Sequence, residues 1–181
     1  MSGYRELLLG CGASRVKKIV PPGSTSTWQA LTTADINSKC SPDWLLDMDR
    51  PQWVIRDPAI TLPAQVFDEV HAYEVLEHLG TQGDVRAFFG TFNNIGFLMK
   101  VGGVLCATTP SRFSPWLWGD PGHRRVILPQ SLVFLSRRMM AAQPKASPAS
   151  DYSGFSRYDW DIERSEDDRE CHRFVLRKVS E

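Results

Sequence analysis

Short apolar runs, each ending at a glycine or near an acid, recur along the first half of the chain. Residues 7–9 are three leucines that lead into a glycine turn at residues 10–12. Residues 28–36 and 44–48 each end at or beside an aspartate, and residues 66–73 alternate apolar with polar positions. These runs predict four β-strands, and a buried run that ends in a glycine turn is typical of a parallel sheet.

Helical periodicity begins after Asp84, which is placed to cap a helix. Apolar side chains recur every three or four positions from residue 85 to residue 99. This spacing predicts an amphipathic helix. Residues 100–103 are expected to end it before a strand at residues 104–109, and a second helix is expected over residues 129–142, with a proline in its first turn.

The last part of the chain has two alternating segments, around residues 158–162 and 174–176, with a charged turn between them. They predict an antiparallel hairpin at the edge of the sheet. In the connection between the first two strands, Pro21, Pro22 and Gly23 exclude a full-length helix. This crossover is therefore expected to be irregular, with any helix in it shorter than about two turns.

Strands that alternate with helices favour an α/β fold. We predict a Rossmann-like, doubly wound sheet of seven mostly parallel strands, with helices on both faces and an antiparallel terminal hairpin. The 181 residues contain no internal repeat and no segment that reads as a domain boundary. The chain is therefore expected to form a single domain over residues 1–181.

The amino-acid composition indicates which broad classes of protein this chain belongs to. Apolar residues make up 42% of the chain and charged residues 23%, which indicates a folded protein rather than a disordered one. Lys and Arg number 21, as do Asp and Glu, so no overall field favours nucleic acid or an anionic membrane. No apolar stretch approaches the roughly 18 residues of a membrane span. The four cysteines are scattered, which suits a reduced, cytoplasmic protein.

The ends of the predicted strands carry the groups that a nucleotide ligand needs. Gly10 and Gly12 allow the backbone to approach a ligand closely. Asp35 follows them at about the 20-residue spacing of an acid that binds ribose hydroxyls. Asp47 and Met48 end the third predicted strand. We expect them to border adenine, with the Asp47 carboxylate accepting a hydrogen bond from the amino group and the Met48 thioether packing on the ring. Each acid taken alone is more often a loop cap or a solvated residue, but their order along the chain favours a nucleotide site.

The same region disfavours a dinucleotide. A G-x-G-x-x-G fingerprint would have its third glycine at Arg15, and Pro21 and Pro22 break the helix whose N-terminus would bind pyrophosphate. S-adenosylmethionine has no phosphate and carries a sulfonium cation. Acidic strand ends therefore suit it better than they suit NAD.

Three segments resemble motifs of the class I S-adenosylmethionine-dependent methyltransferases. They are residues 7–12 (LLLGCG), residues 67–79, which contain VLEHL, and residues 98–105, which contain GGVL. Residues 120–124 further resemble an Asp-Pro-x-His motif of small members of that family. The order and spacing of the family's motifs match over residues 4–110.

The resemblance implies S-adenosylmethionine as the cofactor and methyl transfer to an oxygen or nitrogen nucleophile, by in-line attack that depends mainly on positioning. The implied cofactor contacts are Gly10, Cys11, Gly12, Asp35, Ile36, Asp47, Met48 and Tyr73. Ser14 departs from the family, because many members have a third glycine there. The helices that usually precede the first strand and cover the substrate are missing. The acceptor side is thus expected to be open, or completed by a partner or by a second copy in a homo-oligomer.

The acceptor is not identified by these motifs: we expect a small molecule, and a sugar, a protein or a nucleobase fits as well. Two other functions stay open. One is a non-catalytic, methyltransferase-like subunit for binding or assembly, which a blocked cofactor pocket would reveal. The other is a nicotinamide-dependent oxidoreductase, which Arg15 and the broken crossover disfavour.

Two histidines, His123 and His78, are candidates for catalysis. His123 follows a Pro-Gly turn after the fifth strand, on the acceptor side. A loop histidine with a near-neutral pKa can deprotonate a hydroxyl or an amine, although the alternative is that it only orders the loop. His78 belongs to the set Glu74, Glu77 and His78, which shares one side of a helical turn if a helix begins near Glu74.

This Glu-x-x-Glu-His pattern resembles that of metal-assisted O-methyltransferases, in which the ion orients acceptor hydroxyls. His123 would then be a fourth ligand instead of a base. Carboxylate ligands favour Mg²⁺ or Mn²⁺. In relatives without a metal the same residues cap the helix and hydrogen-bond their neighbours, so metal dependence stays open at this point.

Overall fold

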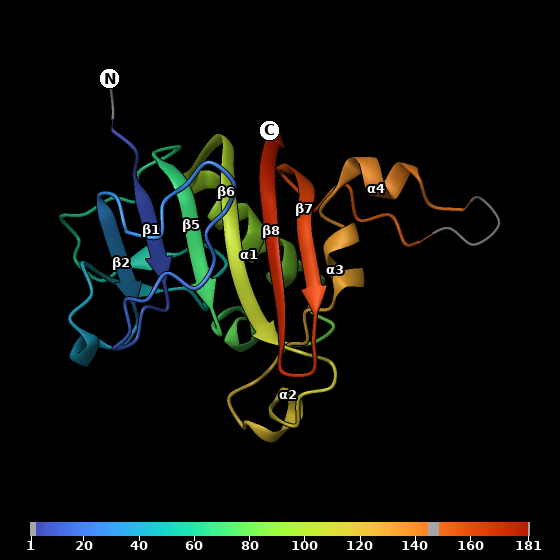
Figure 1. Cartoon of the computed structure of the whole chain (residues 1–181), viewed down its shortest axis with the longest axis horizontal. Helices are drawn as coiled ribbons and strands as arrows, with labels where there is room; N and C mark the ends of the chain where they lie inside the picture. The colour runs from blue at the N-terminus through green and yellow to red at the C-terminus, as the bar shows by residue number, and fades with distance from the viewer. Residues whose placement is uncertain (1–2, 145–148, 181) are drawn as a thin grey trace.

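The computed structural model describes residues 3–144 and 149–180. Within these ranges, eight strands form one sheet in the order β4-β3-β2-β1-β5-β6-β8-β7 (Figure 1). The strands are β1 (Glu6–Leu9), β2 (Leu31–Asp35), β3 (Trp44–Asp47), β4 (Val54–Ile55), β5 (Phe67–Tyr73), β6 (Met99–Pro110), β7 (Asp159–Asp167) and β8 (Cys171–Ser180). The predicted α/β, mostly parallel sheet is confirmed. It has one strand more than the seven expected, because the short β4 pairs antiparallel with β3 at the edge.

The order in which strands are added reverses at β1. β2 and β3 lie on one side of β1, whereas β5 and β6 lie on the other, each parallel to its neighbour. The strands that follow β1 and β5 are thus added on opposite sides of β1, and open α/β sheets bind their ligands at such a point. Antiparallel β8 and β7 extend the sheet beyond β6, as the hairpin prediction requires.

One face of the sheet is covered by α1 (Val85–Leu98). Asp84 caps this helix as predicted, because its side chain accepts a hydrogen bond from the N–H of Ala87 at 2.9 Å. Phe92 of α1 lies in the main hydrophobic core with Trp160 of the terminal hairpin. No helix in the described ranges is long and apolar enough to cross a membrane.

Two details of the helical prediction are wrong. Residues 100–103 belong to β6 rather than to a helix end, since β6 starts at the residue after α1. Residues 129–142 form two helices instead of one, α3 (Pro129–Val133) and α4 (Arg137–Ala141). The hydroxyl of Ser136 accepts a hydrogen bond from the backbone at the start of α4, so this residue begins a new helix. Three further short helices are η1 (Ser38–Cys40), η2 (Leu76–His78) and α2 (Trp116–Gly119).

Residues 11–30 cover the opposite face of the sheet without forming a helix. Figure 1 shows this segment in front of the sheet and α1 behind it. The irregular crossover is therefore confirmed, but the prediction of helices on both faces is wrong, because Pro21 and Pro22 keep this segment non-helical. Ile19 and Trp28 pack instead against a smaller core on this face.

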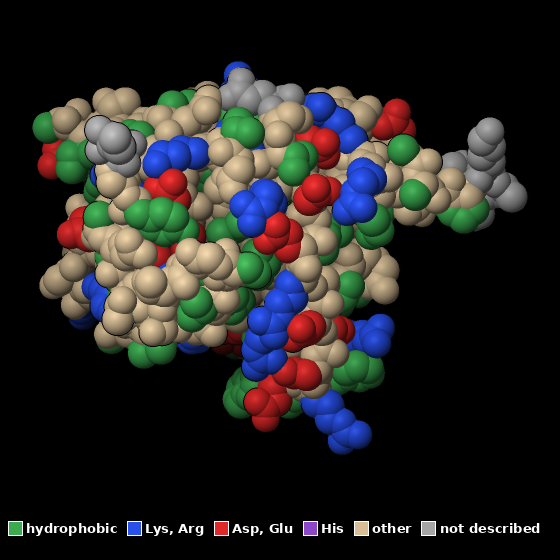
Figure 2. Space-filling model, turned by 45° about the horizontal axis from the view of Figure 1, so that its top comes forward, with side chains coloured by type: hydrophobic (Ala, Val, Ile, Leu, Met, Phe, Trp, Pro, Cys, Tyr) green, Lys and Arg blue, Asp and Glu red, His purple; other side chains and the backbone are tan. Residues whose placement is uncertain are grey.

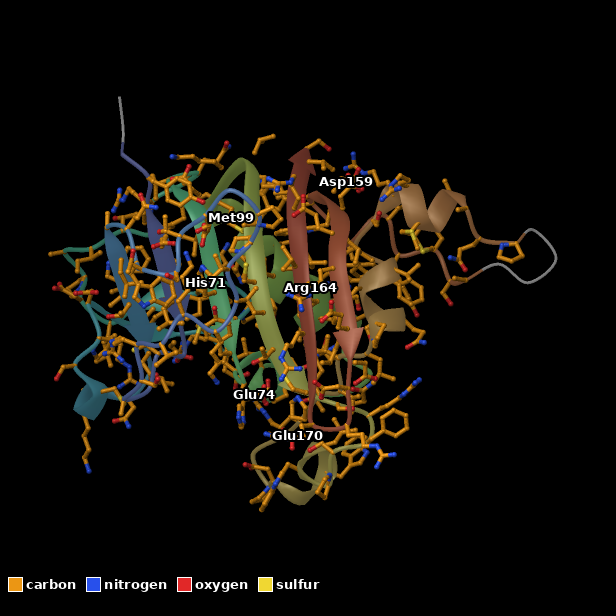
Figure 3. All side chains as sticks on the ribbon, in the orientation of Figure 1. His71, Glu74, Met99, Asp159, Arg164 and Glu170 are labelled. Atoms are coloured by element: carbon orange, nitrogen blue, oxygen red, sulfur yellow. The ribbon has the colours of Figure 1, made fainter. Side chains whose placement is uncertain are left out.

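A buried charged network attaches this segment to the sheet. Lys17 forms an ion pair with Glu6 and another with Glu69, the second at 2.8 Å, and all three side chains are at most 1% exposed. His71, labelled in Figure 3, lies on β5 with its Nε2 atom 2.8 Å from a Glu69 carboxylate oxygen. The ammonium group of Lys17 thus neutralises two carboxylates that the fold has removed from water.

Candidate cofactor and acceptor site

The two glycines of the turn after β1 both adopt left-handed backbone conformations, with φ of 58° at Gly10 and 50° at Gly12. A Cβ atom on Gly10 would lie 2.5 Å from the side chain of Val75, so the backbone there presses against the chain that follows β5. A Cβ atom on Gly12 would meet nothing within 4 Å. Gly10 is therefore required for packing, whereas Gly12 leaves open space at the carboxyl end of β1.

Asp35 ends β2 beside this turn. One carboxylate oxygen accepts a hydrogen bond from the N–H of Gly12 at 2.8 Å, and the other accepts from the N–H of Asn37 at 2.8 Å. The residue is only 9% exposed, so these two bonds fix a nearly buried carboxylate against the glycine turn. Asp35 lies at the end of the second strand, as predicted, and its contact with a ribose stays a prediction.

Cys11 lies between the two glycines but turns its thiol away from the strand ends. The thiol is buried in the smaller core under residues 11–30, and this burial raises its pKa. Its backbone N–H donates to the carbonyl of Ala34 at 3.2 Å, which joins the turn to β2. Only the main chain of Cys11 is left to face a ligand.

The predicted adenine edge lies at the end of β3. Arg50 donates a hydrogen bond to the carboxylate of Asp47 at 2.9 Å and lowers the pKa of that carboxyl group. Met48 is buried but borders a cavity of about 580 Å³ that is also lined by Arg124. Ile36, just beyond β2, is 50% exposed and offers apolar surface near the same edge.

Tyr73 ends β5, but its side chain points to the face of the sheet that residues 11–30 cover. The phenol oxygen accepts a hydrogen bond from the N–H of Ile19 at 3.1 Å and lies 2.6 Å from Nδ1 of His71. Burial there raises the pKa of the phenol well above its usual range. The phenol therefore helps to hold residues 11–30, and only the main chain of Tyr73 lies at the strand end.

Arg15 is a residue of this region whose role the sequence did not indicate. Its guanidinium donates to the carbonyl of Gly12 at 2.6 Å and to the carbonyl of Cys40 at 2.8 Å, and so ties the glycine turn to η1. No helix follows the turn, so the backbone offers no helix N-terminus for a pyrophosphate. This arrangement disfavours a dinucleotide.

A second cluster lies beyond β5, formed by Glu77, His78 and His123. Their potential ligand atoms all lie within 4.8 Å of one another. Glu77 is fully buried in η2, and neither of its carboxylate oxygens has a hydrogen-bond partner. Nε2 of His123 lies 3.9 Å from Glu77 and 3.8 Å from the carboxylate of Asp120. The rings of His78 and His123 meet edge to face, with centroids 4.7 Å apart.

The loop that carries His123 is docked on η2 by backbone contacts. Nδ1 of His78 lies 2.9 Å from the carbonyl oxygen of Gly122, and the N–H groups of Arg124 and Arg125 donate to the carbonyl of Glu77. The loop therefore lies at the carboxyl ends of the strands, where Figure 1 shows α2 beyond the tip of β6. The role of His123 toward an acceptor stays a prediction.

Glu74 does not begin a helix, so the predicted i, i+3, i+4 face is wrong. Its φ is 55°, a left-handed conformation that excludes it from the helical turn, and η2 starts only at Leu76. Figure 3 labels Glu74 at the end of β5. Its carboxylate accepts a weak hydrogen bond from the thiol of Cys171 at 3.6 Å. Burial, together with the charges of Glu74 and Asp120, raises the pKa of Glu77 to about 8.

Acidic and basic side chains are interleaved on the face shown in Figure 2. The aromatic side chains of the loop after β6 point into solvent rather than into a pocket: Phe113, Trp116 and Trp118 are 60%, 67% and 68% exposed.

The sequence matches no known family model and no curated protein. Among solved structures, the chain is similar to the trans-methyltransferase CalH in complex with SAH, with 14% identity and a TM-score of 0.56, over 98% of this chain and 52% of that one. It is also similar to an S-adenosylmethionine-dependent methyltransferase from Archaeoglobus fulgidus, with 16% identity and a TM-score of 0.51, over 97% and 86% of the two chains.

A third similar structure is the [4+2]-cyclase SpnF, with 14% identity and a TM-score of 0.55, over 99% of this chain and 77% of that one. At these identities the likeness concerns the fold. The chain has the fold of the S-adenosylmethionine-dependent methyltransferases. Since a protein named as a cyclase shares that fold, the reaction has to be argued from the site itself.

Proposed function

We propose that this protein binds S-adenosylmethionine at the carboxyl ends of β1, β2 and β3 and transfers its methyl group to an oxygen or nitrogen atom of a small-molecule acceptor. One observation carries the proposal: Gly12, which has open space over its Cα atom, is hydrogen-bonded to the carboxylate of Asp35 at the next strand end. Close backbone approach and a ribose acceptor are thus available side by side. The methyltransferase fold supports the same assignment.

The residues present fit the parts of this cofactor. Each carboxylate oxygen of Asp35 accepts one backbone N–H and so keeps a lone pair for a ribose hydroxyl. Ile36 offers exposed apolar surface for the adenine ring, and Asp47 and Met48 border the same edge. The main chain of Gly12 lies nearest to the space that the rest of the cofactor would fill.

In this reaction the protein mainly positions the cofactor and the acceptor and removes the acceptor's proton. When bound, S-adenosylmethionine supplies a methyl group on a positively charged sulfur. We place the acceptor beside His123, because its loop lies at the same edge of the sheet as the glycine turn. His123 is the candidate base, with the Glu77 carboxyl 3.9 Å from its Nε2 atom. His78 positions the loop through Gly122.

The proposal is tested by incubating the protein with methyl-labelled S-adenosylmethionine and a panel of small alcohols and amines. We expect labelled product together with S-adenosylhomocysteine. His123→Ala should lower turnover by about 10²–10⁴-fold, the usual contribution of a general base, without changing the affinity for S-adenosylhomocysteine. Binding of S-adenosylhomocysteine with no turnover on any acceptor would favour a non-catalytic binding subunit. Binding of NAD alone would favour an oxidoreductase.

A further inference from the structure

A pocket of about 160 Å³ lies where the start of α1 meets α3 and the chain that leads into α3. Four aromatic side chains, which contact one another in a row, form much of its wall: Phe88, Phe89, Tyr152 and Phe134. None of the described residues that line this aromatic pocket is among those of the cofactor and acceptor site. The pocket is therefore separate from the site proposed for methyl transfer.

The size of the aromatic pocket fits a single six-membered ring. A dry apolar cavity of roughly 150 Å³ in another protein holds benzene. The ring centroids of neighbouring wall residues lie 5.2 Å, 5.8 Å and 5.4 Å apart. These separations fall within the range of about 4.5–7 Å at which aromatic pairs attract one another. A ligand ring can make the same edge-to-face and tilted contacts, so the wall favours an aromatic ligand over an aliphatic one.

Arg125 adds a buried cation to this pocket. Its guanidinium lies over the ring of Phe88, 5.4 Å from the centroid, and the residue is 6% exposed. Arginine is almost never buried to this extent without a charged partner, yet none of the described carboxylates forms an ion pair with it. Burial lowers the pKa of Arg125, and the charge of Asp84 opposes that shift without cancelling it. The guanidinium is therefore short of negative charge.

Backbone carbonyls hold the guanidinium in place and leave one of its nitrogens free. Nε donates to the carbonyl of Leu79 at 3.2 Å, and Nη2 donates to the carbonyls of Thr81 and Asp84 at 2.8 Å and 2.9 Å. Nη1 forms no hydrogen bond among the described residues and is not sealed from solvent. Because the other two nitrogens are fixed, Nη1 is oriented before a ligand arrives, and this lowers the entropic cost of binding.

Two hydroxyl groups add hydrogen-bond donors to the same pocket. The hydroxyl of Ser131 accepts from the N–H of Leu128 at 3.2 Å and keeps its own hydrogen for a ligand. The hydroxyl of Tyr152 forms no hydrogen bond in the part of the chain that the structure describes. Asp84 also lines the pocket, and one of its carboxylate oxygens accepts from the N–H of Ala87 at the start of α1. The groups left free are thus mainly donors, which suit a ligand that accepts hydrogen bonds.

We propose that this pocket binds a small aromatic carboxylate, with its ring against the four aromatic side chains and its carboxylate on Nη1 of Arg125. Arginine binds carboxylates through charge-assisted hydrogen bonds, which are roughly twice as strong as those between neutral groups. Benzoate is the simplest member of this class. Benzamide has the same shape without the charge, and benzylamine carries the opposite charge, so the three compounds separate the contribution of the ring from that of the carboxylate.

The test titrates the full chain with each of the three compounds and follows its backbone N–H signals by two-dimensional NMR. We expect benzoate to bind with a Kd of about 1 mM or below and to shift the signals of Gly83, Val126 and Ser131, which line the pocket. Benzamide should bind at least about tenfold more weakly, and benzylamine should not bind. Equal binding of the three compounds, shifts confined to residues outside the pocket, or no binding of benzoate well above that concentration would overturn the inference.

Two variants test the assigned contacts. Val126→Phe adds a ring inside the pocket and should abolish benzoate binding, whereas Val101→Phe, the same change at a residue of β6 that is 53% exposed, is the matched control and should bind normally. Arg125→Gln removes the charge and should weaken benzoate binding more than about tenfold while leaving benzamide binding unchanged. Tyr152→Phe keeps the ring and offers a milder change, with a smaller loss of affinity, should Arg125→Gln fail to fold.

Folding of each variant is checked by its thermal midpoint without ligand. Full affinity for benzoate in a folded Val126→Phe variant would overturn the inference. The inference does not rest on the proposed function, so the two can fail separately. S-adenosylhomocysteine binding in a protein that does not bind benzoate would overturn this inference and leave the proposed function standing. Benzoate binding without S-adenosylhomocysteine binding would do the reverse.

Discussion

Alanine substitution at the two glycines of the β1 turn separates packing from ligand binding. Both glycines have positive φ, 58° and 50°, so either Gly10→Ala or Gly12→Ala places a Cβ atom in the left-handed region. Only at Gly10 does the new atom collide, 2.5 Å from Cγ2 and 2.8 Å from Cβ of Val75. At Gly12 it enters the open space that we assign to the cofactor.

The two variants should therefore differ in stability. The left-handed conformation costs a residue with a Cβ atom about 1–2 kcal/mol, and this applies to both. Overpacking against Val75 adds about 1–3 kcal/mol at Gly10 alone. Gly10→Ala should lower the free energy of unfolding by roughly 2–5 kcal/mol in total, and Gly12→Ala by roughly 1–2 kcal/mol.

Urea denaturation measures these differences, and Val75→Ala made in the Gly10→Ala background tests their cause. Removing the colliding methyl groups should recover part of the lost stability, relative to Val75→Ala alone. Gly12→Ala should fold but bind S-adenosylhomocysteine more weakly than the wild type. Equal destabilisation by the two alanines, or no recovery in the double variant, would refute the assigned division of roles.

Two further predictions concern stability. Lys17→Met should lower the free energy of unfolding by about 3–5 kcal/mol, because it leaves Glu6 and Glu69 buried without a cation. Adding Glu6→Gln should recover part of that loss in urea denaturation, and an additive loss would contradict the ion-pair account. Asp84→Ala should cost about 1 kcal/mol through loss of the bond to the Ala87 N–H, whereas Asp84→Asn should cost little when thermal midpoints are compared.

Elements of the fold were predicted correctly from the sequence where a single local signal determines the secondary structure. The leucine run of β1, the cap at Asp84 and the prolines of the first crossover each gave the correct element. The break at Ser136 was missed, because helical periodicity continues through that residue and only the hydrogen bond at the start of α4 reveals the interruption. The short β4 was missed as well, since two residues are too few to form a pattern.

The candidate site was less accessible to sequence reasoning, because side-chain direction depends on contacts distant along the chain. The spacing from Gly12 predicted that Asp35 ends the second strand, which is correct, but not the hydrogen bond that joins the two residues. Tyr73 was expected to contact the cofactor. Its phenol oxygen instead accepts a hydrogen bond from the N–H of Ile19, on the face of the sheet that residues 11–30 cover. Glu74 was expected in a helical turn, and its left-handed backbone excludes it. No sequence pattern indicates the hydrogen bond of Tyr73 or the backbone conformation of Glu74.

The central claim is that the Asp35 edge of the sheet binds S-adenosylmethionine, and calorimetric titration with S-adenosylhomocysteine tests it most directly. We predict binding of S-adenosylhomocysteine, no binding of NAD, and an affinity weakened by about 1–3 kcal/mol in Asp35→Ala through loss of charge-assisted hydrogen bonds to the ribose. Asp161→Asn, at an exposed ion pair, should bind as the wild type does. Binding of NAD without S-adenosylhomocysteine, or unchanged affinity in Asp35→Ala, would contradict the account.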